Sequence, residues 1–203
     1  MVLYGTDNLS RRSQAYDLLA IAVKEHWALS SLPVLVRASN GKPSFSGVKE
    51  MEFNLSHSGP LAFCALDSAP IGVDIQLVKS WRAALPGRVC SPEELHWLEH
   101  QADYWRGFTT LWALKESRVK QSGQGLTTSI RSISVPLPQD GKALYSHQGL
   151  WFRLYSGETW MGAICALQPP PSEIHWRTLS ASPNSTKATP LFSDITPKGR
   201  DHS

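Results

Sequence analysis

One segment of the chain gathers charged side chains around the apolar face of a predicted helix. Residues 112–120 read WALKESRVK and continue an apolar stripe at helical spacing. Lys115 falls inside that stripe, whereas Glu116 and Lys120 lie four residues apart along its edge. A Glu–Lys pair and a snorkelling lysine would explain the pattern without any function. The alternative is a bound ligand, because burying unpaired charge is costly.

A second unusual position is Asp74, an acidic residue in the middle of the strand pattern IGVDIQ. Aspartate is disfavoured there unless a backbone cap, a turn or a ligand satisfies it. Gln76 points to the same side of the strand. Asp74 and Glu116 together would supply two carboxylates to a hard cation such as Mg²⁺, completed by water and phosphate oxygens. Lys115 and Lys120 beside such a metal favour an anionic ligand that carries phosphate.

A third group, Ser56-His57-Ser58, lies in a polar break between two predicted strands. Its hydroxyl and imidazole groups could bind phosphate oxygens, or the segment could be a polar turn with a satisfied histidine. A catalytic Ser–His dyad is disfavoured, because the two residues are adjacent and the chain has no GxSxG motif. The sequence also has no P-loop and no dinucleotide-binding fingerprint.

The elements that must position these residues alternate between helices and strands. A long helix is predicted over residues 10–29 and a second over 104–121, ended by Gly123 and Gly125. Ser91-Pro92-Glu93-Glu94 predicts the start of a short helix through a capping box. Strands are predicted at residues 34–36, 51–54, 61–66, 71–75, 130–135, 150–155, 160–167 and, at a sheet edge, 174–176.

The composition is that of a soluble globular protein. The chain has 203 residues, of which 41% are hydrophobic, and 20 Lys and Arg against 17 Asp and Glu give a net charge of +3. This balance excludes wholesale disorder, and scattered basic residues do not indicate a nucleic-acid-binding module. Three cysteines without close spacing indicate neither a disulfide framework nor a zinc site. No signal peptide or membrane-spanning run is recognised, so a cytoplasmic protein with no membrane partner is expected.

Three segments together resemble the 4'-phosphopantetheinyl transferase superfamily, in its Sfp-type branch and closest to its AcpT-like members. They are Phe53-Asn54-Leu55-Ser56-His57-Ser58, Ile71 to Gln76, and Trp112 to Lys120 with the following Gly123-Gln124-Gly125-Leu126. Gly41-Lys42-Pro43 is a shorter match. The resemblance implies transfer of the phosphopantetheine arm of coenzyme A to a serine of a small, acidic apo carrier protein, with release of 3',5'-ADP.

The resemblance also implies an α+β fold of two similar α/β halves related by a pseudo-twofold axis, each a small sheet with a long helix. We expect an N-terminal half over residues 1–69, shortened at its start relative to the family, and a C-terminal half with the metal site over residues 70–178. A disordered tail is expected over residues 179–203, which are rich in Ser, Thr and Pro. The protein is expected to be a monomer.

Site roles follow from the same resemblance. Asp74, Glu116 and Gln76 are the expected ligands of Mg²⁺, and Glu116 and Lys120 the expected catalytic residues, with Glu116 as general base. The expected contacts to coenzyme A are Arg12, Lys42, Pro43, Ser56, His57, Lys115 and Lys120. Many family members have glutamate where this chain has Gln76, which removes one negative charge from the site. The alternative is therefore a catalytically weakened member that binds carrier protein or nucleotide.

Overall fold

The computed structural model describes residues 1–37, 41–123, 125 and 129–180. Its strands are β1 (Val2–Thr6), β2 (Leu35–Arg37), β3 (Pro43–Phe45), β4 (Glu52–Ser58), β5 (Leu61–Asp67), β6 (Gly72–Leu77), β7 (Leu144–His147), β8 (Leu150–Ser156), β9 (Trp160–Ala166) and β10 (His175–Trp176). Its helices are α1 (Ala15–Trp27), α2 (Leu85–Val89), α3 (Pro92–Glu99) and α4 (Tyr104–Ser122), with 3-10 turns at Arg12–Gln14 and Ile130–Ser132. The prediction of a mixed fold of helices and sheets is confirmed.

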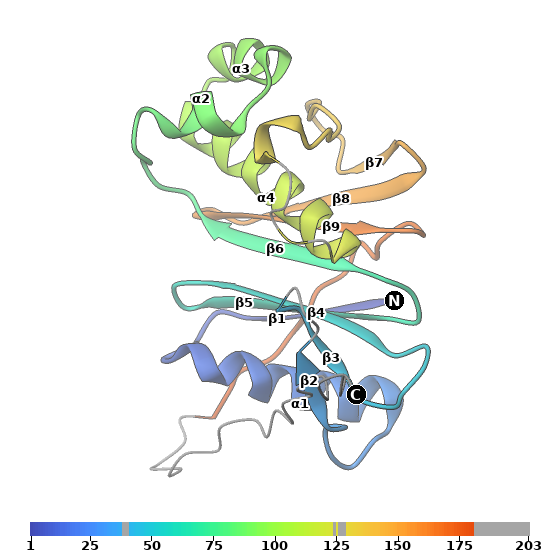
Figure 1. The fold of residues 1–203 in the computed structure, drawn as a ribbon. Coiled ribbons are helices and arrows are strands. Elements are labelled where there is room, and N and C mark those ends of the chain that lie inside the picture. The colour runs from blue at the N-terminus through green and yellow to red at the C-terminus, as the bar shows by residue number, and fades with distance from the viewer. Residues whose placement is uncertain (38–40, 124, 126–128, 181–203) are drawn as a thin grey trace, which may run out of the picture.

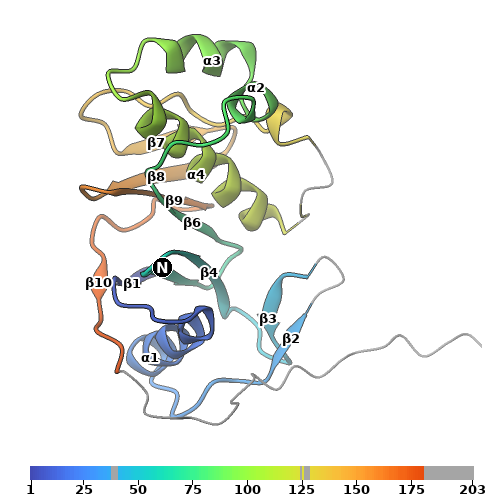
Figure 2. The same ribbon diagram turned by 90° about the vertical axis from the view of Figure 1, so that its left-hand side faces the viewer.

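The described part of the chain is layered, with two sheets stacked between α1 and α4 (Figure 1). The first sheet has the strand order β10-β1-β5-β4 and the second the order β6-β9-β8-β7. A two-stranded sheet of β2 and β3 lies beside β4 (Figure 2). In this arrangement β4 and β6 are edge strands of different sheets, and they lie next to each other at the middle of the molecule.

Side chains of the central strands alternate between the two faces of each sheet, which explains the layered arrangement. In β5, Ala62, Cys64 and Leu66 face the core under α1, whereas Leu61, Phe63 and Ala65 face the second sheet. In β9, Ala163 and Cys165 pack under α4, while Ile164 and Ala166 face the first sheet. Strands that bury both faces must be apolar throughout, and each large buried side chain stabilises the fold by about 1.5–3 kcal/mol.

The helices begin and end where the local sequence requires it. Ser91 and Glu94 form the predicted capping box at the start of α3, with Ser91 N donating to Glu94 Oε2 at 2.7 Å. In α4, the Asp103 side chain accepts from the backbone nitrogen of Arg106, and Gly123 closes the helix in the left-handed conformation at φ 65°. The predicted end of this helix at Gly123 is therefore confirmed.

Two predictions about strands are wrong. Ser56 and His57 do not lie in a break between strands, because β4 continues through Ser58 and the hairpin turn follows it. Residues 130–135 form no strand but a 3-10 turn and irregular chain, since the carbonyl groups of Ile130 and Ile133 converge on Lys115. The strand that fills this edge of the second sheet is β7, which the sequence did not predict, and β1 was likewise missed.

The last described residues return to the first sheet. The predicted edge strand at residues 174–176 is observed as β10, which pairs with β1 in parallel (Figure 2). Leu179 is buried, and its backbone exchanges hydrogen bonds with the Asn8 side chain at 2.8 and 3.0 Å. The rest of the predicted disordered tail, residues 181–203, lies outside the described residues. None of the helices in the described ranges is both long and apolar enough to cross a bilayer.

Candidate functional site

Asp74 lies against α4 because the strand that carries it has a glycine two residues earlier. The odd-numbered residues of β6 face the other sheet, so Gly72 and Asp74 face the helix. A Cβ atom at Gly72 would lie 2.0 Å from the backbone oxygen of Ser117 and 2.3 Å from the backbone nitrogen of Gln121. Only glycine therefore allows this close packing of α4, which brings Lys120 to Asp74.

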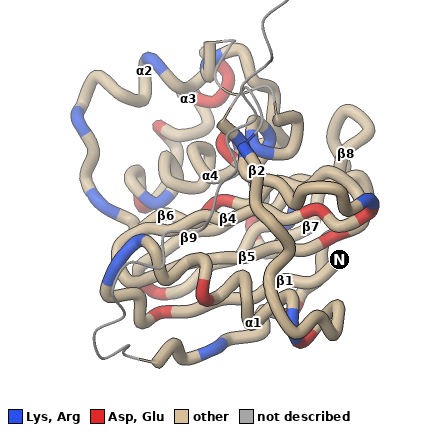
Figure 3. Tube along the Cα trace, turned by 60° about the horizontal axis from the view of Figure 1, so that its bottom comes forward, with Lys and Arg blue, Asp and Glu red and all other residues tan. Residues whose placement is uncertain are grey.

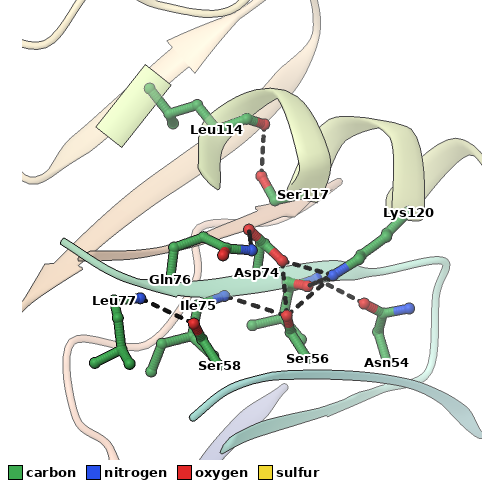
Figure 4. Close-up of polar contacts among 11 residues, drawn as sticks. Asn54, Ser56, Ser58, Asp74, Ile75, Gln76, Leu77, Leu114, Ser117 and Lys120 are labelled. Carbon is green, nitrogen blue, oxygen red and sulfur yellow. Dashed lines mark hydrogen bonds and ion pairs between the residues drawn. The ribbon is translucent and has the colours of Figure 1, made fainter. Parts of the chain in front are cut away.

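The Asp74 carboxylate is buried and receives three hydrogen bonds (Figure 4). Its Oδ1 accepts from Lys120 Nζ at 2.7 Å and from Ser56 Oγ at 2.7 Å. Its Oδ2 accepts from Gln76 Nε2 at 2.9 Å. These donors explain how an aspartate is tolerated in the middle of an apolar strand, and they join β4, β6 and α4 at one point.

Lys120 belongs to this cluster, and its side chain is also partly exposed. Besides the ion pair, its Nζ donates to Ser56 Oγ at 3.1 Å and to the carbonyl oxygen of Val73 at 3.1 Å. Its side chain is nevertheless 26% exposed, whereas that of Asp74 is 2% exposed. The ammonium group is thus held in place by three acceptors while the side chain lines the pocket, so an anionic ligand there would exchange for one of these hydrogen bonds.

Glu116 lies one turn before Lys120 and lines the same pocket as Asp74. Burial raises the pKa of Glu116 above its ordinary value, and the negative charge of Asp74 raises it further, while Lys120 lowers it. A carboxylate with a raised pKa is a stronger base, so Glu116 can accept a proton more readily than a solvated glutamate.

These residues surround a pocket of about 330 Å³ between β4, β6 and α4. The lining residues are Arg12, Leu55, Ser56, His57, Asp74, Gln76, Trp112, Glu116 and Lys120. Seven residues assigned to the site from the sequence thus come together from four separate segments of the chain. Of the remaining three, Lys42 and Pro43 line an adjoining pocket of about 240 Å³ that shares Leu55 and Lys120 with the first.

Two basic residues in these pockets are partly desolvated. Burial lowers the pKa of His57, and the positive charges of Arg12 and Lys120 lower it further, while Asp74 raises it. The imidazole is therefore neutral at pH 7 and can serve as a hydrogen-bond partner for phosphate. Burial likewise lowers the pKa of Lys42, whose Nζ donates to the carbonyl oxygen of Ile71 at 3.4 Å, close to the limit of a hydrogen bond.

The donor set fits a hard divalent cation. Mg²⁺ prefers carboxylate oxygens and keeps several of its waters, so two protein ligands can hold it. Asp74 and Glu116 provide two such groups in one pocket, and their mutual repulsion, which adds to the effect of burial in raising the pKa of Glu116, is what a cation would relieve. Gln76 instead directs its amide nitrogen at Asp74. Within the described residues, no cluster of three or more His, Cys, Asp and Glu side chains is arranged for a metal ion.

Lys115 is not part of the pocket, which corrects the expectation that it contacts the ligand. Its side chain is completely buried, and its Nζ forms an ion pair with Glu94 Oε2 at 2.9 Å. It also donates to the carbonyl oxygens of Ile130 at 3.1 Å and Ile133 at 2.7 Å. The lysine therefore anchors the chain after α4 to α3 and has no side that a coenzyme can reach.

Two residues that the sequence did not mark as site residues contribute to the pockets. Trp112 was assigned to the buried stripe of α4, but it is half-buried, lines the pocket and stacks on Trp81 with ring centroids 5.6 Å apart. Asn54 lines the adjoining pocket and accepts from the backbone nitrogen of Val73 at 2.9 Å. The signal that could have revealed Asn54 is the alternation of polar residues at positions 54, 56 and 58.

Comparison with known proteins identifies similar chains. Residues 70–167 match the model of the family described as the 4'-phosphopantetheinyl transferase superfamily. The 4'-phosphopantetheinyl transferase Sfp of Bacillus subtilis (strain 168) is 37% identical over 139 residues, which cover 64% of this chain and 61% of Sfp. The 4'-phosphopantetheinyl transferase ffp of Bacillus subtilis is 32% identical over 177 residues, covering 82% of this chain and 78% of ffp.

A third relative is the 4'-phosphopantetheinyl transferase AcpT of Salmonella typhi. It is 37% identical over 121 residues, which cover 55% of this chain and 60% of AcpT. The matched regions of Sfp and AcpT are therefore about three fifths of those proteins. Five of the nine residues that line the pocket fall within the span matched by the family model, namely Asp74, Gln76, Trp112, Glu116 and Lys120.

Proposed function

The chain belongs to the 4'-phosphopantetheinyl transferase superfamily, in its Sfp-type, AcpT-like branch, and we propose that it transfers phosphopantetheine from coenzyme A to a serine of an apo carrier protein. The observation that carries the proposal is the single pocket in which Asp74, Glu116 and Lys120 meet. Two carboxylates and a lysine at one edge of an open cleft are suited to phosphoryl transfer, which depends on positioning and on neutralising charge.

In this proposal Lys120 acts on the phosphate that bears the pantetheine arm. The carrier serine oxygen attacks that phosphorus, and the bond from the phosphorus to the departing 3',5'-ADP breaks. Negative charge develops on the phosphate oxygens and on the leaving group. Lys120 lines the pocket and can stabilise this charge by exchanging its bond to Ser56 for one to a phosphate oxygen, while its bonds to Asp74 and Val73 hold it in place.

Glu116 is the proposed general base. The serine must lose its proton as it attacks, and the Glu116 carboxylate, which lines the same pocket, can accept it, directly or through a water. Asp74 and Glu116 would also hold Mg²⁺, which, when bound, neutralises pyrophosphate charge. Glu116 reaches the ligand from α4 and Asp74 from β6, so the two residues approach it from different elements.

The coenzyme is proposed to extend from this pocket into the adjoining one. Arg12 and His57 lie at one rim and offer a cation and a neutral imidazole to phosphate oxygens. Lys42 and Pro43 line the next pocket, where the nucleotide would lie. Lys120 borders both pockets, which supports a ligand with phosphate at their junction.

An acidic carrier protein is the proposed partner. The segment between β6 and α2 carries Lys79 and Arg82, and α2 carries Arg88, so basic residues recur along one edge of the molecule (Figure 3). Such a distribution, with the net charge of +3, favours association with an acidic surface. The proposed pseudo-twofold relation of the halves is supported by two four-stranded sheets, each covered by one long helix, with β2 and β3 as an additional two-stranded sheet in the first half. A monomeric state and a cytoplasmic location stay predictions.

The proposal is tested by intact-mass spectrometry of apo carrier proteins. The full chain is incubated with coenzyme A, Mg²⁺ and apo carriers from fatty-acid, polyketide and peptide synthesis. The expected result is a carrier that gains the mass of one phosphopantetheine group, with no gain in EDTA or on a carrier whose target serine is replaced by alanine. Binding of coenzyme or carrier without any gain of mass, across all carriers, would contradict transferase activity.

A further inference from the structure

Two histidines lie one turn apart on the outer face of α3, which forms the end of the second half opposite to the first sheet (Figure 1). His96 lies within α3, and His100 is the residue that follows its last turn. Both side chains are exposed, and their ring centroids are 4.6 Å apart. Residues four positions apart share one face of a helix, so the backbone brings the two rings together. The proposed transfer reaction uses neither of them.

The ring of His100 is held in one orientation by the helix itself. Its Nδ1 lies 2.7 Å from the backbone carbonyl oxygen of His96. A carbonyl oxygen only accepts hydrogen bonds, so Nδ1 carries the proton and, in the neutral ring, Nε2 carries the lone pair. Histidines that bind metal ions are oriented in the same way, by a hydrogen bond from the second ring nitrogen to a carbonyl or carboxylate oxygen. The lone pair of His100 is therefore presented at Nε2, on the exposed surface.

The inner face of α3 is fixed to the rest of the second half. Leu98 is completely buried, and Trp97 Nε1 donates to the carbonyl oxygen of Pro138 at 3.1 Å. Glu94 forms its ion pair with Lys115 of α4. Because these contacts already order the helix, two ligands on its outer face need little further ordering to bind one ion.

The charges around the two histidines favour a cation. Residues 89–105 include four acidic residues and no lysine or arginine, although the net charge of the chain is +3. Glu94 is neutralised by Lys115, but Glu93 and Glu99 are exposed on α3 itself. Such a local excess of negative charge raises the concentration of cations at the surface.

The ligand chemistry selects the kind of cation. Imidazole nitrogen suits Zn²⁺, Ni²⁺ and Cu²⁺, whereas Mg²⁺ prefers oxygen ligands. An ion bound at about 2.0–2.1 Å from two nitrogens requires them to lie within about 4 Å of each other. Rings whose centroids are 4.6 Å apart can meet this condition by small side-chain rotations.

We propose that His96 and His100 together bind one divalent transition-metal ion, through one ring nitrogen each. Within the described ranges, no third His, Cys, Asp or Glu side chain completes a metal-binding cluster, so water fills the other positions around the ion. The site differs from the pocket of Asp74 and Glu116 in place and in chemistry, because its ligands are nitrogen atoms. It does not depend on the proposed function.

The proposal is tested by calorimetric titration of the full chain, without a histidine tag, with Ni²⁺. Excess Mg²⁺ is present, because it occupies oxygen ligands and competes poorly for imidazole. The wild type is compared with His96→Gln, His100→Gln and the double variant. His26→Gln, which removes a single exposed histidine from α1, is the matched control.

Chelation by two rings predicts that the single variants are not additive. The wild type should bind one Ni²⁺ at this site, and each single variant should raise its Kd at least about tenfold. The double variant should add little to that loss, because one remaining imidazole no longer chelates. His26→Gln should leave the Kd unchanged. With one equivalent of Cu²⁺, electron paramagnetic resonance should show two nitrogen ligands in the wild type and fewer in each single variant.

Thermal unfolding provides an independent measurement. Without metal, the variants should unfold close to the wild-type temperature, because the substituted side chains are exposed. Ni²⁺ at about a hundredfold above the Kd should raise the unfolding temperature of the wild type and of His26→Gln by several degrees, and that of the other variants less. Equal Ni²⁺ binding by the wild type and the double variant would overturn the proposal. So would two independent weak sites, of which each single variant removes one.

Discussion

Helix α4 contributes the lysines of two ion pairs, Lys115–Glu94 and Lys120–Asp74, and the two pairs serve different purposes. The Lys115–Glu94 pair joins α4 to α3, and its lysine side chain is 0% exposed. The Lys120–Asp74 pair joins α4 to β6, and its lysine side chain is 26% exposed. In the first pair the remaining ammonium contacts are backbone carbonyls of a loop, whereas in the second they include the hydroxyl of Ser56, in a pocket lining.

The difference shows how similar charges become structural or functional. A buried ion pair with every donor satisfied stabilises one arrangement of the chain, and its loss leaves an uncompensated charge. A pair at the wall of a pocket retains a solvated side, where a ligand can replace water. Variants that disturb each pair separately therefore test whether Lys115 stabilises the fold and Lys120 acts in the reaction.

The largest expected effect is on stability, at Lys115. Lys115→Met leaves Glu94 buried without its partner, and we expect a loss of about 3–5 kcal/mol in the free energy of unfolding, measured by urea titration. Glu93→Gln, on the exposed side of the same turn, should change little. Combining Lys115→Met with Glu94→Gln should restore part of the loss, because the amide removes the unpaired charge. No loss in Lys115→Met would contradict a structural role.

The next largest effect is expected on the rate of phosphopantetheine transfer, in a variant of Lys120. Lys120→Met should lower the transfer rate at saturating coenzyme and Mg²⁺ by about a hundredfold, roughly 3 kcal/mol, because a cation on the phosphate is lost. Its free energy of unfolding should fall less than that of Lys115→Met, since water and the donors Ser56 and Gln76 still satisfy Asp74. Lys24→Met, an exposed change on α1, controls for loss of charge. A variant with full activity would remove Lys120 from the reaction.

A smaller effect is the pH dependence of stability in the metal-free protein. The pKa of Glu116 is raised in the folded state, so folding favours its protonated form. The resulting contribution to the free energy of unfolding is fully present below the ordinary pKa of 4.5. It is lost as the pH rises through the raised pKa of Glu116 in the folded state. Glu116→Gln should remove this decline and be the more stable protein at neutral pH. Unfolding temperatures of the wild type and Glu116→Gln, measured in EDTA from acid to neutral pH, test this prediction. If the two proteins show the same dependence on pH, the prediction is wrong.

The smallest effect concerns Gln76, which donates to Asp74 where many relatives have glutamate. Gln76→Glu replaces that bond with a like charge, and we expect a loss of roughly 1 kcal/mol in metal-free stability. The added carboxylate should also lower the Mg²⁺ concentration that gives half-maximal transfer. Gln76→Met, which loses the bond without adding charge, is the control. An unchanged Mg²⁺ requirement in Gln76→Glu would show that position 76 does not influence the metal.

The central residues of the pocket could be predicted from the sequence because they are charged side chains in apolar surroundings. Asp74 in an apolar strand, and Glu116 and Lys120 at the edge of an apolar stripe, each require an external partner. The same reasoning failed for Lys115, whose partner Glu94 belongs to a separate helix. Helical spacing locates a charge on a face but does not reveal which distant side chain meets it there.

The course of β4 was missed for a related reason. The sequence predicts a strand that ends at Asn54 and a polar break at Ser56 to Ser58, because polar residues at these positions have no obvious partner in the local sequence. The partner is the backbone of β6, an edge strand of the other sheet. The stacking of two sheets whose edge strands β4 and β6 lie side by side is a tertiary arrangement that local propensity does not contain.

The most direct test of the account measures phosphopantetheine on the carrier serine for the wild-type chain and for Glu116→Ala under identical conditions. Carrier mass and released 3',5'-ADP are followed together in the presence of Mg²⁺, with thermal unfolding to show that both proteins are folded. We predict one phosphopantetheine and one 3',5'-ADP per carrier with the wild type, and neither with Glu116→Ala. A folded Glu116→Ala protein that modifies the carrier at the wild-type rate would contradict the assignment of this pocket as the catalytic site.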